Sequence, residues 1–148
     1  MRPQLPPTFA LHQRLAGLAL LAITLTPLLM AAGLQANPAG HGTHTQLGLT
    51  PCGFLAATGS PCATCGMTTA FTHVAHGQWI SAAAVQPAGT LLALICAMGV
   101  LVGGHTVATG MRVTALLQHL IRSHVVLPTI AIVLLAWLYT AVRMGWPH

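Results

Sequence analysis

The chain has 148 residues, of which 55% are hydrophobic and 3% are charged, and its only fixed charges are five arginines. Because no Asp or Glu is present, paired-carboxylate catalysis and a Ser-His-Asp triad are excluded within the chain, and carboxylate-rich Ca²⁺ or Mg²⁺ sites are disfavoured. So few charges cannot cover a water-facing surface. The composition therefore predicts a protein solvated mainly by lipid, whose arginines face anionic head groups rather than nucleic acid.

Three apolar runs are long enough to cross a bilayer as helices, which takes about 20 residues each. They cover residues 15–34, 88–109 and 125–142. Pro27 and Pro128 are expected to kink or start their helices, which membrane helices tolerate. The first run is followed by small residues, so a cleaved signal peptide is an alternative interpretation of it. The pattern predicts an all-α integral membrane protein with three transmembrane helices and a single domain.

The arginines predict how these spans are oriented. Arg2 and Arg14 precede the first span, and Arg112 and Arg122 lie between the second and the third, whereas residues 35–86 hold no Arg or Lys. Lys and Arg are enriched in cytoplasmic loops. The resulting topology is 1–14 inside, 35–86 outside, 110–124 inside and 143–148 outside.

The third span ends in side chains that suit the outer interface of a membrane. Trp137, Tyr139 and Trp146 fit an interfacial belt, and Arg143 is the one charge that departs from the rule. We expect a multi-pass protein of a bacterial inner membrane. The lipid bilayer is its expected partner. A membrane protein partner or a homo-oligomer is also compatible with the sequence, and no nucleic-acid partner is expected.

The segment between the first two spans begins as a loop, because Gly, Pro, Asn and Thr cluster in residues 35–51 without periodicity. After it, "TGSP" at 58–61 is a turn signal that would fold the chain back on itself. Such a turn would bring Cys52 close to the Cys-x-x-Cys pair formed by Cys62 and Cys65.

A helical pattern follows the cysteine pair. Its apolar stripe, with the period of an α-helix, consists of Met67, Ala70, Phe71 and Val74. Its polar face consists of Cys65, Thr69, Thr72, His73 and His76. Gly77 is expected to end the helix, after which "QWISAAAVQP" leads into the second span with Trp79 at interfacial depth. The pattern predicts a short amphipathic surface helix on the outer leaflet.

Cysteine and histidine are the strong metal ligands that this chain offers. A helix rises about 1.5 Å per residue, so Cys65 and His76 would lie ~16 Å apart, too far to share one ion. The first candidate metal site is therefore Cys52, Cys62 and Cys65, completed by His41 or His44. A second candidate is the pair His73 and His76, which are alternatively plain polar-face residues. Zinc is the expected metal, with Cu(I) as the alternative.

Three interpretations of the Cys-x-x-Cys pair stay open. A helix N-terminus favours thiolate, which serves a metal site and a redox couple equally, with Cys52 as resolving thiol in the redox case. A structural disulfide in an accessory subunit is the third, because disulfides persist outside the cytosol. Three outer cysteines favour a Cys₃His site over one bridge with a thiol left over. We expect a non-enzymatic membrane component and assign no catalytic residue.

The second span carries three features of its own. Gly99 and Gly103 form a GxxxG motif that permits close approach of a helix, from the same chain or from a second copy. Cys96 is expected to be a small packing residue. His105 is either a functional group, as ionisable residues at membrane depth often are, or a structural hydrogen-bond partner.

Residues 50–105 resemble a bacterial family, domain-of-unknown-function family 2752. The family pattern runs Cys, a turn with Gly, Cys-Pro-x-Cys-Gly-x-Thr-Arg, a His-Gly pair and a later Asn-Pro. The matching residues are Cys52, Gly59, Cys62, Cys65, Gly66, Thr68, His76 and Gly77. Ala63 replaces the motif proline, Thr69 replaces the arginine, and Gln86-Pro87 replaces Asn-Pro. The resemblance implies a small membrane protein with a cysteine motif after its first span, and the family has no assigned activity.

Overall fold

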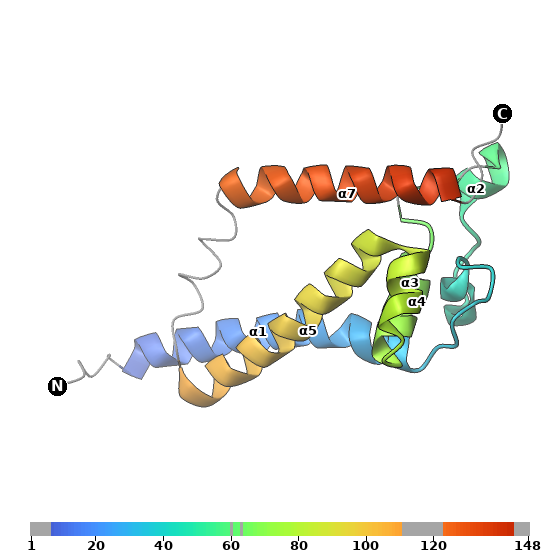
Figure 1. Cartoon of the computed structure of the whole chain (residues 1–148). Coiled ribbons are helices and arrows are strands. Elements are labelled where there is room, and N and C mark those ends of the chain that lie inside the picture. Colours follow the sequence, from blue (N-terminus) through green and yellow to red (C-terminus); the bar gives the residue numbers. More distant parts are fainter. Residues whose placement is uncertain (1–6, 60, 63, 111–122, 144–148) are drawn as a thin grey trace.

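The computed structural model describes residues 7–59, 61–62, 64–110 and 123–143. Within these residues the chain is all-helical and has no strand, which confirms the predicted fold class at that level. The elements are α1 (Pro7–Ala32), η1 (Thr43–Leu47), α2 (Gly53–Thr58), α3 (Met67–Ala75), α4 (Trp79–Val85), α5 (Pro87–Thr109) and α7 (Ser123–Arg143). The short elements gather at the end of the molecule where α1 finishes and α5 begins (Figure 1).

Two of the described helices are long and apolar enough to cross a membrane. They cover Ala10–Ala32 and Pro87–Thr109, each with a mean hydropathy of 2.1. The first two predicted spans are therefore present as candidates, and the prediction of three is corrected to two. The third, 125–142, does form helix α7, but several of its side chains, including that of Trp137, lie outside the description. Arg2, Arg112, Arg122 and Trp146 also lie outside the described residues.

Helices α1 and α5 pack through small residues. A Cβ built on Gly103 would lie 2.9 Å from the Leu21 nitrogen and 3.0 Å from the Gly17 oxygen. A Cβ on Gly99 would lie 2.5 Å from the Thr24 methyl carbon. The backbones can approach this closely because no side chain stands between them. The GxxxG motif thus faces α1 of the same chain.

Helix α3 buries its apolar stripe against this pair. A small core joins α3 to α1, α4 and α5 and consists of Ala31, Ala70, Phe71, Val74, Ala82 and Ala93. Met67 of the stripe and Cys96 of α5 are partly buried against it. Burial of this kind, at about 25 cal/mol per Å² of apolar surface, is the main force that holds a short helix in place.

The predicted polar face of α3 is wrong at its two threonines. Thr69 and Thr72 are both 0% exposed. The Thr69 hydroxyl shares a hydrogen bond of 2.8 Å with the hydroxyl of Thr43 in η1, and the Thr72 hydroxyl donates to the Thr68 carbonyl over 2.9 Å. Because their polar groups are satisfied internally, burial costs these residues little. Helix α3 is therefore packed against α1, α4, α5 and η1 rather than laid on a surface by itself.

The segment predicted simply to lead into the second span contains helix α4. Gly77, with φ +74°, ends α3, and the Gln78 N–H donates to the His73 carbonyl over 2.8 Å. Gln86 then caps α5: it is fully buried, and its side-chain oxygen accepts from the N–H groups of Ala88 and Gly89. A capping side chain of this kind satisfies donors that the first turn of a helix leaves free.

Candidate metal centre

Three cysteines from two separate segments meet in front of α3. Cys52 precedes α2, and the left-handed Gly59 after α2 turns the chain, with its N–H donating to the Leu55 carbonyl over 2.9 Å. The Cys52 sulfur lies 3.5 Å from that of Cys62 and 3.6 Å from that of Cys65, and the last two are 3.2 Å apart. None of the three is bridged. The return of the chain that was expected from the turn at 58–61 is present, although Ser60 lies outside the described residues.

A tight turn fixes the Cys-x-x-Cys pair. The Cys65 N–H donates to the Cys62 carbonyl over 3.0 Å, and the Met67 N–H donates to the Thr64 carbonyl over 3.1 Å. The Cys62 N–H donates in turn to the Cys65 sulfur over 3.3 Å. These bonds hold both sulfurs on one side of the turn. Helix α3 begins only at Met67. The prediction that Cys65 lies on its polar face is therefore wrong. Ala63 lies outside the described residues.

Gly66 lets a neighbouring loop reach this turn. Its φ is +83°, and a Cβ there would lie 2.8 Å from the Gly40 carbonyl oxygen. Three residues further along that loop, the buried Thr43 accepts the Asn37 N–H over 3.1 Å and bonds to Thr69. The loop thus closely approaches the cysteine turn at Gly66 and is hydrogen-bonded to α3 at Thr69. Neither contact was anticipated, although a glycine directly after a Cys-x-x-Cys pair is a signal for a positive φ.

The pKa values of the two cysteines of the pair are shifted in opposite directions. Partial burial alone would raise the pKa of Cys62, but hydrogen bonds from the Thr64 hydroxyl, the Cys65 thiol, the Thr64 N–H and the Cys52 thiol outweigh it and lower the pKa to about 7. Burial, together with donation of its proton to Cys62, raises the pKa of Cys65 to about 12. Cys62 is therefore the thiolate of the pair near neutral pH. The donors that act on it are groups of the turn together with the Cys52 thiol from the preceding segment.

This asymmetry predicts selective alkylation. In the reduced, metal-free protein, iodoacetamide is expected to modify Cys62 well before Cys65, because the thiolate is the nucleophile. The rate at Cys62 should rise with pH and reach half of its maximum near pH 7, since the ionised fraction follows the lowered pKa. Peptide mass spectrometry after timed alkylation between pH 5 and 9 measures this. Equal rates at Cys62 and Cys65, or a midpoint near the ordinary thiol value of about 8.5, would contradict it.

The sulfur triangle has the dimensions of a metal site. Zinc binds thiolate at about 2.3 Å, which in a tetrahedron separates sulfurs by about 3.8 Å. The sides of 3.2 to 3.6 Å found here need to lengthen by only a few tenths of an ångström. Among the described residues, the cluster whose ligand atoms all lie within 4.8 Å of one another contains these three cysteines and no histidine. A fourth ligand has to come from a little further away.

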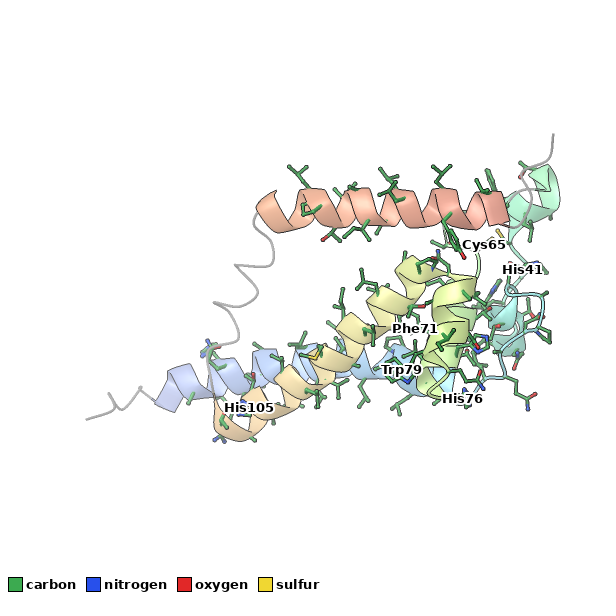
Figure 2. The ribbon with its side chains drawn as sticks, viewed as in Figure 1. His41, Cys65, Phe71, His76, Trp79 and His105 are labelled. Atoms are coloured by element: carbon green, nitrogen blue, oxygen red, sulfur yellow. The ribbon has the colours of Figure 1, made fainter. Side chains whose placement is uncertain are left out.

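Two of the predicted histidines lie at this site and two do not. The cysteines open into a hollow of about 500 Å³ that both His41 and His44 line. His73 and His76 are absent from that lining, and Figure 2 places His76 at the end of α3 away from Cys65. Their Nδ1 atoms lie 2.6 Å from the Gln78 side-chain oxygen and 2.7 Å from the Thr72 carbonyl, respectively.

His105 is separate from all of these groups. It lies near the far end of α5 (Figure 2), where it is exposed. The Thr109 hydroxyl donates to the His105 carbonyl over 2.7 Å. Among the described residues, the metal-ligand cluster does not include His105. Both interpretations of His105 therefore stay predictions.

Fold and site together define an all-helical chain with two candidate membrane spans and a three-cysteine cluster that could hold a metal. A family described as "Protein of unknown function (DUF2752)" matches residues 52–100, which confirms the resemblance inferred from the sequence over that segment. The match begins at Cys52 and ends within α5, so it includes the cysteine turn but not the loop of His41 and His44. No curated protein and no solved structure matches the chain.

Proposed function

We propose that the chain is a non-enzymatic membrane protein that binds one zinc ion through Cys52, Cys62 and Cys65. The observation that carries the proposal is the triangle of unbridged sulfurs, 3.2 to 3.6 Å on a side, assembled from two segments. Thiolates suit zinc and Cu(I), whereas the hard ions need oxygen ligands that a chain without carboxylates does not supply. The lowered pKa of Cys62 means that one ligand is already ionised near neutral pH.

The metal would have a structural task. Helix α2 has no buried residue, so packing contributes little to holding its segment in place. Cys52 joins that segment to the start of α3, and a bound ion would close the loop that runs from Cys52 to Cys65. Metal binding to such a site adds directly to folding free energy, because the unfolded chain lacks the preformed ligands.

Elemental analysis of the protein purified in mild detergent, without chelator, tests this. We expect about one zinc per chain, as in a Cys₃His site. Cys62→Ser and Cys65→Ser should lose the metal and melt at a lower temperature. Cys96→Ser should keep the metal, because Cys96 lies in α5, partly buried against the core and apart from the cluster. Unchanged metal content in the first two variants would contradict the proposal. If copper were found in place of zinc, the proposed ligands would stand and the proposed metal would be wrong.

The proposed setting of this site is the outer face of a bacterial inner membrane, with α1 and α5 as the two spans and the N-terminus inside. Arg14 supports this orientation: its Nε lies 3.8 Å from where a Cβ on Gly110 would stand, so a positive charge marks the end of the helix pair that carries the C-terminus of α5. The cysteines lie at the other end (Figure 2). Alkylation of Cys62 in intact cells by a membrane-impermeant reagent, after a chelator has removed the metal, is the expected result.

The same packing favours a first span that is retained rather than cleaved as a signal peptide. Helix α1 supplies the surface against which Gly99 and Gly103 are packed. Removing it would leave this face of α5 without its partner. Besides the bilayer, we propose a membrane protein or a second copy of the chain as a partner.

One observation favours a second function, thiol–disulfide exchange. The Cys62 thiolate lies 3.2 Å from the Cys65 sulfur. It would attack the disulfide of a partner protein and release one partner thiolate, after which Cys65, losing its proton, would displace the other and close a Cys62–Cys65 bridge. A purified protein without metal, in which two outer thiols react only after reduction and the bridge equilibrates with a dithiol buffer, would support this function over zinc binding. A bridge that resists reduction would instead be the structural disulfide.

A further inference from the structure

The proposed zinc site has three ligands close together and needs a fourth. We propose that His41 is that ligand; this inference rests on the proposed zinc site. The two candidates from the sequence were His41 and His44, and the structure distinguishes them by how each is attached and by what each ring is bonded to.

The backbone places His41 directly beside the cysteine turn. Its preceding residue, Gly40, has its carbonyl oxygen 2.8 Å from where a Cβ on Gly66 would stand, and Gly66 follows Cys65. Two residues after His41, Thr43 is fixed to Thr69 through the hydroxyl pair at 2.8 Å. His41 therefore lies between a point where its loop closely approaches Gly66 and a point where the loop is hydrogen-bonded to α3. In Figure 2 its side chain lies at the same end of α3 as Cys65.

The His41 ring can reach the metal position without breaking existing bonds. It lines the hollow into which the sulfurs open, and among the described residues its imidazole makes no hydrogen bond. It is flanked by Gly40 and Gly42, with φ of +76° and +80°. Glycine on both sides leaves this residue free to adjust its backbone, while the contact of Gly40 with Gly66 and the hydrogen bond of Thr43 to Thr69 stay in place.

One nitrogen of the His44 ring is already hydrogen-bonded. Its Nε2 lies 3.2 Å from the Thr50 carbonyl, and since a carbonyl only accepts, this nitrogen carries the proton. That bond would break if Nε2 bound the metal, so His44 could be a ligand only through Nδ1, with Nε2 still donating to the carbonyl. His44 stands directly after Thr43 in η1, with no glycine beside it, so its backbone has less freedom than that of His41 to bring the ring toward the sulfurs.

Charge also favours an imidazole in the fourth position. Zinc with three thiolates carries a net charge of −1, and residues 35–86 contain no Arg or Lys to offset more. A neutral imidazole adds no charge, whereas a further anion would raise the uncompensated charge in a partly buried site. The charge of the site thus favours a neutral fourth ligand, which the imidazole of His41 provides.

X-ray absorption spectroscopy at the zinc edge of the full chain in detergent tests the assignment. We expect wild type to show three sulfurs and one imidazole, recognised by the scattering from its ring carbons. In His41→Ala, three sulfurs should remain, the imidazole signal should disappear, and zinc affinity, measured with a competing chelator, should fall by at least about tenfold, as for loss of ligand-supporting groups. His44→Ala, the matched control, should keep the imidazole signal and the affinity.

A second variant keeps the assignment testable if His41→Ala does not fold. His41→Cys should retain zinc and give four sulfurs without imidazole, because only a residue that touches the ion can replace the donor atom. An imidazole signal that persists in both His41 variants, or that vanishes in His44→Ala, would overturn the role of His41 while leaving the zinc site intact. Wild-type protein without bound metal would instead mean that the proposed function itself has failed.

Discussion

Alanine at position 66 is expected to abolish metal binding while all three cysteines are still present. A non-glycine residue in the left-handed region costs about 1–2 kcal/mol. In addition, the new Cβ would lie 2.8 Å from the Gly40 carbonyl oxygen, a backbone atom that cannot move aside as a flexible side chain can. The turn of Cys62 and Cys65 and the loop of His41 would therefore be pushed apart. Zinc content and melting temperature of Gly66→Ala in detergent measure the effect, and both should fall.

Gly59→Ala is the matched control for this experiment. Gly59 has φ +69° and so imposes the same backbone cost, but a Cβ there meets nothing within 4 Å. It should lower stability by the conformational term alone and keep most of its zinc. If both variants lose metal equally, the left-handed conformation and not the contact with Gly40 is what the site requires, and the packing argument is wrong.

The second large effect is expected where α1 and α5 touch. Gly103→Leu places a side chain where the Leu21 nitrogen and the Gly17 oxygen are within about 3 Å of its first carbon. Overpacking of a fitted interface typically costs about 1–3 kcal/mol, and here the obstacles are backbone atoms of the facing helix. The helices should separate, and because α3 is packed on both, the cysteine end should loosen as well. Thermal or denaturant unfolding in detergent, followed by circular dichroism, measures the loss.

The next residue along α5 offers the control. Gly104 has nothing within 4 Å of where its Cβ would lie. Gly104→Leu adds the same apolar volume one position further on and should leave stability nearly unchanged. Equal destabilisation by the two leucines would mean that glycine at this depth matters for the helix backbone rather than for its contact with α1.

Several features of the site could be predicted because they depend on local patterns. The apolar stripe Met67, Ala70, Phe71 and Val74 has the period of a helix, and that face is the one packed inside the molecule. The turn residues near 58–61 correctly indicated that Cys52 returns to the Cys-x-x-Cys pair. The long apolar runs at 15–34 and 88–109 likewise correspond to the two candidate spans.

The features that were missed depend on individual hydrogen bonds, on contacts between distant segments or on elements too short to show a pattern. Thr69 and Thr72 look like a solvated face, and only the hydroxyl of Thr43, 26 residues earlier, and a carbonyl within α3 make their burial acceptable. Helices α2 and α4 and the η1 turn are too short to show a period. The difference between His41 and His44 arises from the contact of Gly40 with Gly66 and from the bond to Thr50, neither of which leaves a trace in the spacing of the residues.

The lack of buried residues in α2 has a consequence for its local stability. A helix of six residues with none of them buried has almost no local stability of its own, since isolated helices this short are marginal in water. Its opening free energy then depends on the sulfur cluster to which Cys52 belongs, and stability of this kind varies from segment to segment within one fold. The rate of amide hydrogen exchange in residues 53–58 would accordingly depend on whether the site holds its metal. Exchange would be slow with the metal bound and fast without it. The rest of the helical end, held by its own core, would exchange at the same rate in both states.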